Sequence, residues 1–243
     1  MASISNNEIK SIKALANKKF RDEKGLFVVE GEKMVAEALK SPFEVVSVYR
    51  ADEIGEAAMA RISMLSSPSP VLAVVRKPAM EAPAKLETGL YLALDGIRDP
   101  GNMGTIIRIA DWFGIKGIFA TSDSVDIFNP KVVQSTMGAI FRMDFRYADL
   151  CALADYVKAG GGRVYGTFLD GRNIYGHELE TGEDSPVVIV VGNESNGISK
   201  EMAARVTDRL YIPPYPADDP GSESLNAAVA TAVTVAEFRR RLI

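Results

Sequence analysis

The chain has 243 residues, 47% of them hydrophobic and 25% charged, and it carries a formal net charge of −4. This length suits one large or two small domains, and this composition is typical of a globular protein. With one cysteine, Cys151, and one histidine, His177, the chain lacks the ligands for a Cys/His zinc site and the pairs for a disulfide framework. No acidic cluster has the spacing of a known metal-binding loop, so we expect no bound metal.

The N-terminal residues contain no apolar stretch of the kind that marks a signal peptide. The longest apolar runs, residues 187–191 and 227–236, fall short of the roughly 18 residues that a membrane span needs. We therefore expect a cytoplasmic protein without membrane contact.

Residues 1–77 show short alternating helical and extended patterns, which predict a small α/β domain. Apolar residues recur at helical spacing at Ile9, Ile12 and Leu15. Strands are predicted over 26–29, 43–48 and 71–75, with helices over 32–40 and 54–64. Residues 78–88 contain two prolines and no periodicity, so they are predicted to link this domain to a second one over residues 89–243.

Basic residues gather in the segment 10–24, which has six lysines and arginines against two acidic residues, a local charge of +4. A solvated helix face accounts for this pattern. The alternative is a surface that contacts nucleic-acid phosphates, with Phe20 available for stacking on a base. Under this alternative Lys18, Lys19 and Arg21 are the candidate contacts.

From residue 90 onward strands and helices alternate, which predicts an α/β fold whose parallel sheet is covered by helices on both faces. The predicted strands are 90–94, 117–121, 163–169, 187–191 and 209–212. The predicted helices are 105–113, 130–138, 148–159, 200–206 and 224–242.

The first predicted strand of this region leads into a turn, Pro-Gly-Asn-Met-Gly, over residues 100–104. Such a turn is expected to expose backbone N–H groups at a helix start, where an anion is stabilised. Arg108 follows within an apolar helical register, so we expect it to be buried against an anion or another acceptor. Trp112 and Phe113 are expected in the core. The glycine spacing matches neither a dinucleotide-binding fold nor a P-loop.

Two later junctions place polar residues where strands end. The strand over 187–191 continues into Gly-Asn-Glu at residues 192–194, at the edge where open α/β sheets bind ligands. After the final strand, a polar loop leads into the last helix, and Ser222 or Ser224 is expected to cap it. This cap would leave Asn226 inside the apolar face of the helix.

Together these junctions resemble the motifs of the SpoU/TrmH-type RNA 2′-O-ribose methyltransferases of the SPOUT superfamily. The first motif corresponds to residues 102–108, the second to 192–194, and the third to 212–213 with 224–226. Residues 19–32 are similar to the substrate-binding domain of that family, which is L30e-like. Residues 129–139 match another stretch of the family, and this stretch includes Lys131.

The resemblance implies a second domain with a deep trefoil knot, S-adenosyl-methionine (SAM) as methyl donor, and a homodimer in which each active site is built from both subunits. It assigns the donor to the backbone at Gly192, Ile212 and Leu225. It adds Lys131 to the candidate RNA contacts. The catalytic residues that it implies are Arg108, Asn102, Glu194, Ser224 and Asn226.

Arginine is effectively always protonated, so we expect Arg108 to bind the phosphate of the target nucleotide and to polarise its 2′-hydroxyl. Asn102 and Asn226 would orient the acceptor. Glu194 would position Arg108 or the hydroxyl, and Ser224 would cap the last helix and contact the site.

The predicted function is SAM-dependent methylation of a ribose 2′-hydroxyl in structured RNA. The separate front domain leads us to expect rRNA, by analogy alone. A tRNA substrate and a non-catalytic RNA-binding homologue are the alternatives. The chain departs from the family at Gln134, where an arginine is common, and in the loop over 215–221, which is longer and more acidic than usual.

Overall fold

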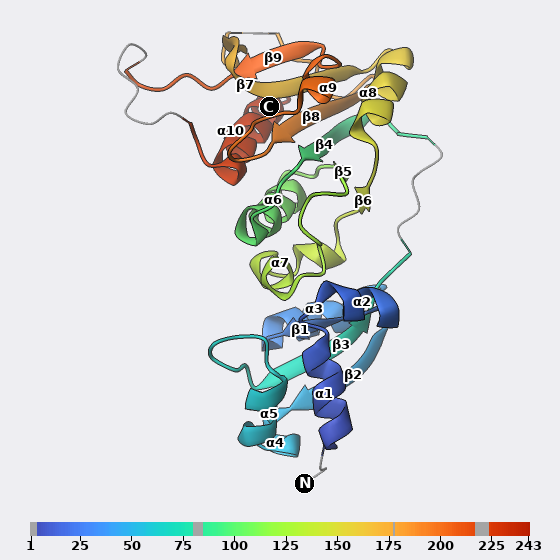
Figure 1. The fold of residues 1–243 in the computed structure, drawn as a ribbon. Coiled ribbons are helices and arrows are strands. Elements are labelled where there is room, and N and C mark those ends of the chain that lie inside the picture. The colour runs from blue at the N-terminus through green and yellow to red at the C-terminus, as the bar shows by residue number, and fades with distance from the viewer. Residues whose placement is uncertain (1–3, 80–84, 177, 217–223) are drawn as a thin grey trace. The chain divides into compact units, whose positions relative to one another are not determined.

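The computed structural model describes residues 4–79, 85–176, 178–216 and 224–243 (Figure 1). His177, the predicted cap Ser222 and residues 217–221 of the acidic loop lie outside the described residues. Contacts divide the chain into two units. The first unit contains residues 1–79 and 126–142, and the second contains residues 80–125 and 143–243.

The first unit contains a three-stranded antiparallel sheet in the order β1-β3-β2. Its strands agree with the predicted ones to within two residues at either end, but the single helix predicted over 54–64 is wrong, because Gly55 (φ 86°) separates two helices. In chain order, the elements are α1 (Asn6–Ala14), α2 (Lys18–Lys24), β1 (Leu26–Glu30), α3 (Glu32–Lys40), β2 (Val45–Arg50), α4 (Ala51–Ile54), α5 (Glu56–Ile62) and β3 (Val71–Arg76).

The segment 126–142 comes from the second half of the sequence but packs within the first unit. It carries α7 (Pro130–Ser135) and a short 3-10 helix (Ala139–Phe141), so the helix predicted over 130–138 ends early. The rings of Phe27 and Phe128 lie 4.7 Å apart, centroid to centroid. Because of this segment, the chain passes between the units three times rather than once at the predicted linker.

The second unit contains a six-stranded sheet in the order β6-β5-β4-β8-β7-β9, and the pairings are parallel as predicted. Strand β6 gives no periodic signal in the sequence because it has three residues. No helix within the described ranges is long and apolar enough to span a membrane. The elements are β4 (Gly89–Asp95), α6 (Pro100–Trp112), β5 (Gly117–Ala120), β6 (Phe145–Tyr147), α8 (Leu150–Ala159), β7 (Arg163–Asn173), β8 (Pro186–Gly192), α9 (Lys200–Ala203), β9 (Asp208–Tyr211) and α10 (Ala227–Arg240).

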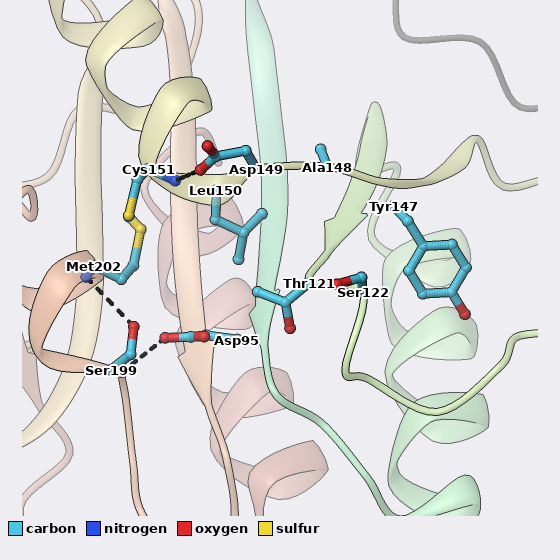
Figure 2. A pocket seen from close by; sticks show the side chains of 10 residues that line it. All are labelled: Asp95, Thr121, Ser122, Tyr147, Ala148, Asp149, Leu150, Cys151, Ser199 and Met202. Atoms are coloured by element: carbon cyan, nitrogen blue, oxygen red, sulfur yellow. Dashed lines mark hydrogen bonds between the residues drawn. The ribbon is translucent and has the colours of Figure 1, made fainter.

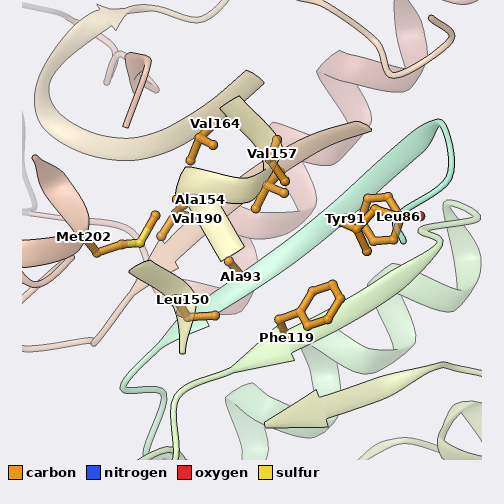
Figure 3. Packing of buried hydrophobic residues seen from close by; sticks show 11 residues of the cluster. Leu86, Tyr91, Ala93, Phe119, Leu150, Ala154, Val157, Val164, Val190 and Met202 are labelled. Atoms are coloured by element: carbon orange, nitrogen blue, oxygen red, sulfur yellow. The ribbon is translucent and has the colours of Figure 1, made fainter. Parts of the chain in front are cut away.

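The central strand β4 is buried along almost its whole length, as expected for a parallel strand between helices. Tyr91 and Ala93 of this strand pack in one cluster with Leu150 of α8 (Figure 3). The helices α6 and α10 pack against each other. The strands β4 and β8 pair in parallel up to their carboxyl ends, where Asp95 is opposite Gly192.

Candidate active site

Helix α6 begins at Pro100, so the predicted turn over residues 100–104 is its first turn. Asp99 caps the helix, and its Oδ1 accepts a hydrogen bond from the backbone N–H of Asn102 at 2.8 Å. The anion site predicted here is therefore wrong, because a carboxylate of the chain itself occupies the helix start and would repel a second anion. The sequence signal for this cap is the Asp-Pro pair that precedes the helix.

The loop after β8 is shaped by Asn193. Its backbone N–H and C=O pair with Gly197 at 2.9 Å each. Its Nδ2 donates to the carbonyl of Gly96 at 2.7 Å, which ties the loop to the end of β4. At Gly192 an added Cβ atom would lie 2.3 Å from the backbone of Gly197, so only glycine lets the loop close onto β8. These contacts set the position of Glu194.

Helix α10 begins at Ala227, and Asn226 is its N-cap. Asn226 Oδ1 accepts hydrogen bonds from the backbone N–H groups of Ala228 (3.0 Å) and Val229 (3.3 Å). The prediction that Ser224 caps this helix, with Asn226 inside it, is therefore wrong. Asparagine is as good an N-cap as serine, and Asn226 is the residue directly before the apolar run.

Three predicted site residues meet in one hydrogen-bonded chain, which we call the amide chain. Asn226 Nδ2 donates to Asn102 Oδ1 at 2.9 Å, and Asn102 Nδ2 donates to Glu194 Oε1 at 2.9 Å. The capping bonds fix its direction: because Asn226 Oδ1 accepts the N–H groups of α10, its Nδ2 must face Asn102. The donors therefore run from α10 through α6 to the Glu194 carboxylate.

Arg108 stands apart from the amide chain. It is exposed, and it makes no hydrogen bond or ion pair with any residue that the structure describes. The expected burial of Arg108 is wrong, because the residue lies on the solvent side of α6. Trp112, one turn later, is 84% exposed and so is not in the core either. Four residues apart on one helix, the two side chains share an exposed face of α6.

A cavity of about 730 Å³ lies beside the amide chain. It is lined by Gly192, Ile212 and Leu225, the three positions predicted to hold the cofactor, and also by Glu194 and Ser224. Its volume falls within the range of pockets that hold small molecules the size of a nucleoside cofactor. The residues present therefore fit the predicted cofactor.

A second cavity, of about 460 Å³, lies at the carboxyl ends of β4, β5 and β6 (Figure 2). In its wall Asp95 Oδ2 accepts a hydrogen bond from the backbone N–H of Ser199 at 2.7 Å. This bond anchors the far end of the loop that carries Glu194, so Asp95 supports the site indirectly. Within the described ranges, no group of His, Cys, Asp and Glu side chains could hold a metal ion.

The predicted RNA contacts all lie in the first unit, and three of them, Lys18, Lys19 and Lys131, are exposed. Lys18 pairs with Asp22 at 2.5 Å, and Lys77 pairs with the same carboxylate at 2.6 Å. These two hydrogen bonds, that of Lys18 first, hold the pKa of Asp22 below its usual range. Part of the positive charge of this segment is therefore balanced within the protein.

Arg21 is 1% exposed. Its Nε and Nη2 donate to Asp126 Oδ2 at 3.0 and 2.6 Å, and its Nη1 donates to the carbonyl groups of Leu15 and Ala16 at 2.8 Å each. Its donors are thus used inside the first unit. This burial contradicts the predicted RNA contact at Arg21, because the side chain fastens the segment 126–142 instead.

Residues 89–236 match the model of the SpoU rRNA Methylase family. The chain belongs to the SpoU rRNA methylase family. Residues 6–81 match the MRM3-like substrate binding domain. These matches confirm the resemblance and the α/β fold predicted from the sequence, whereas the trefoil knot stays a prediction.

Similar proteins match nearly the whole length of the chain. The sequence is 32% identical to 23S rRNA (guanosine(2553)-2′-O)-methyltransferase RlmP of Bacillus subtilis, over 98% of each protein. The fold of this chain is similar to that of a TrmH-family protein from Porphyromonas gingivalis. The TM-score is 0.88, and the two sequences are 38% identical over 99% of this chain and 100% of that one. It is also similar to AdoMet-bound rRNA methyltransferase from Sinorhizobium meliloti, with a TM-score of 0.87 and 30% identity over 100% and 98% of the two chains.

Proposed function

We propose that this SpoU-family enzyme uses SAM to methylate a ribose 2′-hydroxyl in rRNA. The observation that carries the proposal is that the amide chain borders the cavity lined by Gly192, Ile212 and Leu225. A cofactor pocket and a set of oriented polar groups thus share the carboxyl edge of one sheet, where α/β folds bind ligands. The B. subtilis relative, which acts on a 2′-oxygen of 23S rRNA, supports the same reaction.

SAM, when bound, supplies a methyl group on a positively charged sulfur. The transfer would form a bond from the 2′-oxygen to the methyl carbon, break the carbon–sulfur bond and release the hydroxyl proton to solvent. The protein must hold the hydroxyl in line with that bond and favour loss of its proton. Asn102 is bonded on both sides, so its orientation is set before RNA binds. Glu194 can then offer its other oxygen, bonded to Asn193 only at 3.4 Å, to the hydroxyl or to Arg108.

Arg108 completes the site from a second copy of the chain. Its guanidinium faces solvent on α6 with Trp112 beside it, and Val229 on the adjoining α10 is half exposed. A homodimer that covers this face would bury the indole and bring Arg108 to the partner's amide chain. There Arg108 binds the target phosphate and lowers the pKa of the 2′-hydroxyl.

Mixed dimers test this arrangement. The variants Arg108→Ala and Glu194→Gln are each expected to be inactive alone. When the two are refolded together, half of the dimers are mixed, and each mixed dimer has one complete site, so about one quarter of wild-type activity should return. Activity that stays at the level of the separate variants would show that Arg108 acts within its own subunit.

The first unit supplies the RNA-binding surface through Lys18, Lys19 and Lys131, which are exposed. The match of residues 6–81 to a substrate binding domain supports this role for Lys18 and Lys19. An rRNA substrate requires a compartment that contains ribosomes, and we propose the cytoplasm.

A methyl-transfer assay tests the function. Labelled SAM is incubated with the protein and with rRNA or tRNA from a strain that lacks this gene, and the modified site is mapped by primer extension. We expect incorporation into rRNA as a 2′-O-methyl nucleotide. The matched control is Glu201→Gln, which changes a carboxylate on α9 outside the amide chain. Incorporation into tRNA alone would show that the substrate is tRNA and not rRNA. No incorporation into either RNA, together with no SAM binding by calorimetry, would overturn the proposal.

A further inference from the structure

Met137 has a backbone conformation that few residues with side chains adopt. It follows α7 after Thr136, and its φ is 50°, the left-handed region. Among the described residues other than glycine, it alone has a positive φ. The position after a helix end commonly takes this conformation, but glycine or asparagine normally fills it, because a larger side chain crowds the backbone.

The neighbours of Met137 hold this conformation in place. Thr136 is buried, and its Oγ1 donates to the carbonyl of Val133 at 2.7 Å. Gly138 follows with a φ of 96°, and a Cβ atom there would lie 3.1 Å from Glu37 of α3. The backbone N–H of Ala139 returns to the carbonyl of Thr136 at 3.1 Å. The turn is therefore mounted rigidly on the first unit.

Packing within the chain does not compensate for this conformation, because the Met137 side chain is 54% exposed. Residues that the surrounding structure holds in such a disfavoured conformation cluster at ligand-binding and active sites. Methionine is flexible and polarizable, and it is one of the side chains that proteins pack against or insert between bases.

The charge around Met137 favours RNA as the partner. Residues 127–143 contain Lys131 and Arg142 and no acidic residue, although the whole chain is net negative. Lys131 is exposed on α7, the helix that leads into the turn. Arg142 pairs with Glu37. Because the charge of Arg142 is balanced by Glu37, Lys131 is the side chain that we expect to hold a phosphate, with neighbouring bases within reach of Met137.

We propose that Met137 is an RNA-contact residue whose side chain packs against a base of the bound rRNA, with Lys131 holding an adjacent phosphate. This role rests on the proposed function, and it adds a base contact to the phosphate contacts predicted there. Met137 is a binding residue rather than a catalytic one, because its proposed contact is a base of the RNA and not the reacting atoms.

Four variants of the full chain test the role. Met137→Ala removes the apolar side chain and keeps the strain, Met137→Leu keeps an apolar side chain, and Met137→Gly removes both side chain and strain. Leu39→Ala is the matched control, since Leu39 is 55% exposed on α3 of the same unit. Filter binding to unmethylated rRNA, SAM calorimetry and thermal melting are measured for each.

We expect Met137→Ala and Met137→Gly to weaken rRNA binding about fivefold to tenfold, the lower end of what base stacking contributes. Met137→Leu and Leu39→Ala should stay within about twofold of wild type, and SAM binding should be unchanged in all four. Met137→Gly should also melt no lower than wild type, because glycine suits the left-handed position. Weaker RNA binding without loss of stability is a result that a purely structural role does not give.

Unchanged rRNA binding in Met137→Ala, while the wild type binds and methylates rRNA, would overturn this inference and leave the proposed function standing. A wild type that binds no rRNA would overturn both. If Met137→Ala instead converted dimers to monomers in size-exclusion chromatography, the side chain would contact a second copy of the chain, and the RNA role would be wrong.

Discussion

Helix α2 and helix α6 each carry an arginine, and the two side chains meet opposite surroundings. Arg21 on α2 is enclosed by Asp126 and two backbone carbonyl groups. Arg108 on α6 is exposed and has no partner in the part of the chain that the structure describes. A guanidinium whose donors are satisfied inside the protein has little left for a ligand, whereas an exposed one can bind phosphate or carboxylate with its planar fork. Of these two arginines, Arg108 is therefore the one that is available to a ligand.

The strongest test of this contrast is Arg108→Ala, which we expect to lower kcat about 10³-fold, because the transition state would lose its fixed positive charge. Arg108→Lys should restore little, because an ammonium cannot reproduce the bidentate geometry. The free energy of unfolding should not change, because Arg108 stabilises nothing in the subunit. Methyl-transfer assays and urea denaturation measure the two effects.

The control for Arg108 is Arg98→Ala, which removes an exposed arginine of the same unit that pairs with Asp123. We expect kcat to stay within about twofold of wild type, as for an ordinary surface pair. Near-normal turnover in Arg108→Lys would refute the phosphate-binding role of Arg108.

For Arg21→Met we expect the opposite pattern, a loss of stability without a loss of the cofactor site. We expect the free energy of unfolding to fall by about 3 kcal/mol, because Asp126 would remain buried without its partner. SAM binding by the folded fraction should be unchanged. Asp126→Asn and the double variant complete a double-mutant cycle in urea, in which additive losses would show that the pair has no coupling.

Asn226 is expected to affect both activity and stability, since its side chain both caps a helix and donates into the amide chain. Asn226→Asp keeps the capping oxygen but faces Asn102 Oδ1 with a second acceptor, so we expect about a 10²-fold loss of kcat with little loss of stability. Asn226→Ala should in addition lose about 1 kcal/mol through the missing cap. Equal stability of the two variants would mean that the cap contributes nothing.

The smallest expected effect concerns Glu237 on α10, a carboxylate that pairs with two arginines. It is buried, and Arg240 (2.7 Å) and Arg241 (2.9 Å) hold its pKa below the usual range, Arg240 contributing most. A lowered folded pKa means that the pair stabilises the fold above the unfolded pKa of about 4.3, and that this contribution is lost as the pH falls through the folded value.

Because Arg240 is well exposed, we expect this loss to be modest, about 1 kcal/mol between pH 7 and pH 3. The Glu237→Gln variant should show a smaller acid loss than wild type when both are unfolded in urea at the two pH values. Identical losses would assign the acid sensitivity to other carboxylates.

Much of the fold could be predicted from the sequence, because hydrophobic strands separated by helices give a periodic signal. The strand over 187–191 and the helix over 32–40 are recovered nearly residue for residue. Strand β6 was not, since three residues carry no period. The grouping of residues 126–142 with the first unit depends on packing between distant segments, such as Phe128 against Phe27, which no local pattern encodes.

The site shows the same limit. Local motifs identified Asn102, Glu194 and Asn226, but the amide chain joins residues 92 and 124 positions apart, and its direction depends on which residue caps α10. Arg21 was expected at the surface because its segment is basic, and Arg108 was expected to be buried because its helix is apolar. Both expectations were wrong, because the tertiary contacts and not the local composition decide which side of a helix faces solvent.

The chain passes between the units three times, and this determines where it can be divided into fragments. A fragment cut at residues 78–88 would lose Asp126 from beside Arg21 and Phe128 from beside Phe27, while the remaining piece would carry the segment 126–142 without the surface it covers. Neither piece therefore corresponds to a complete unit. Exchange of the first unit between relatives would therefore require the transfer of two segments together, residues 1–79 and residues 126–142.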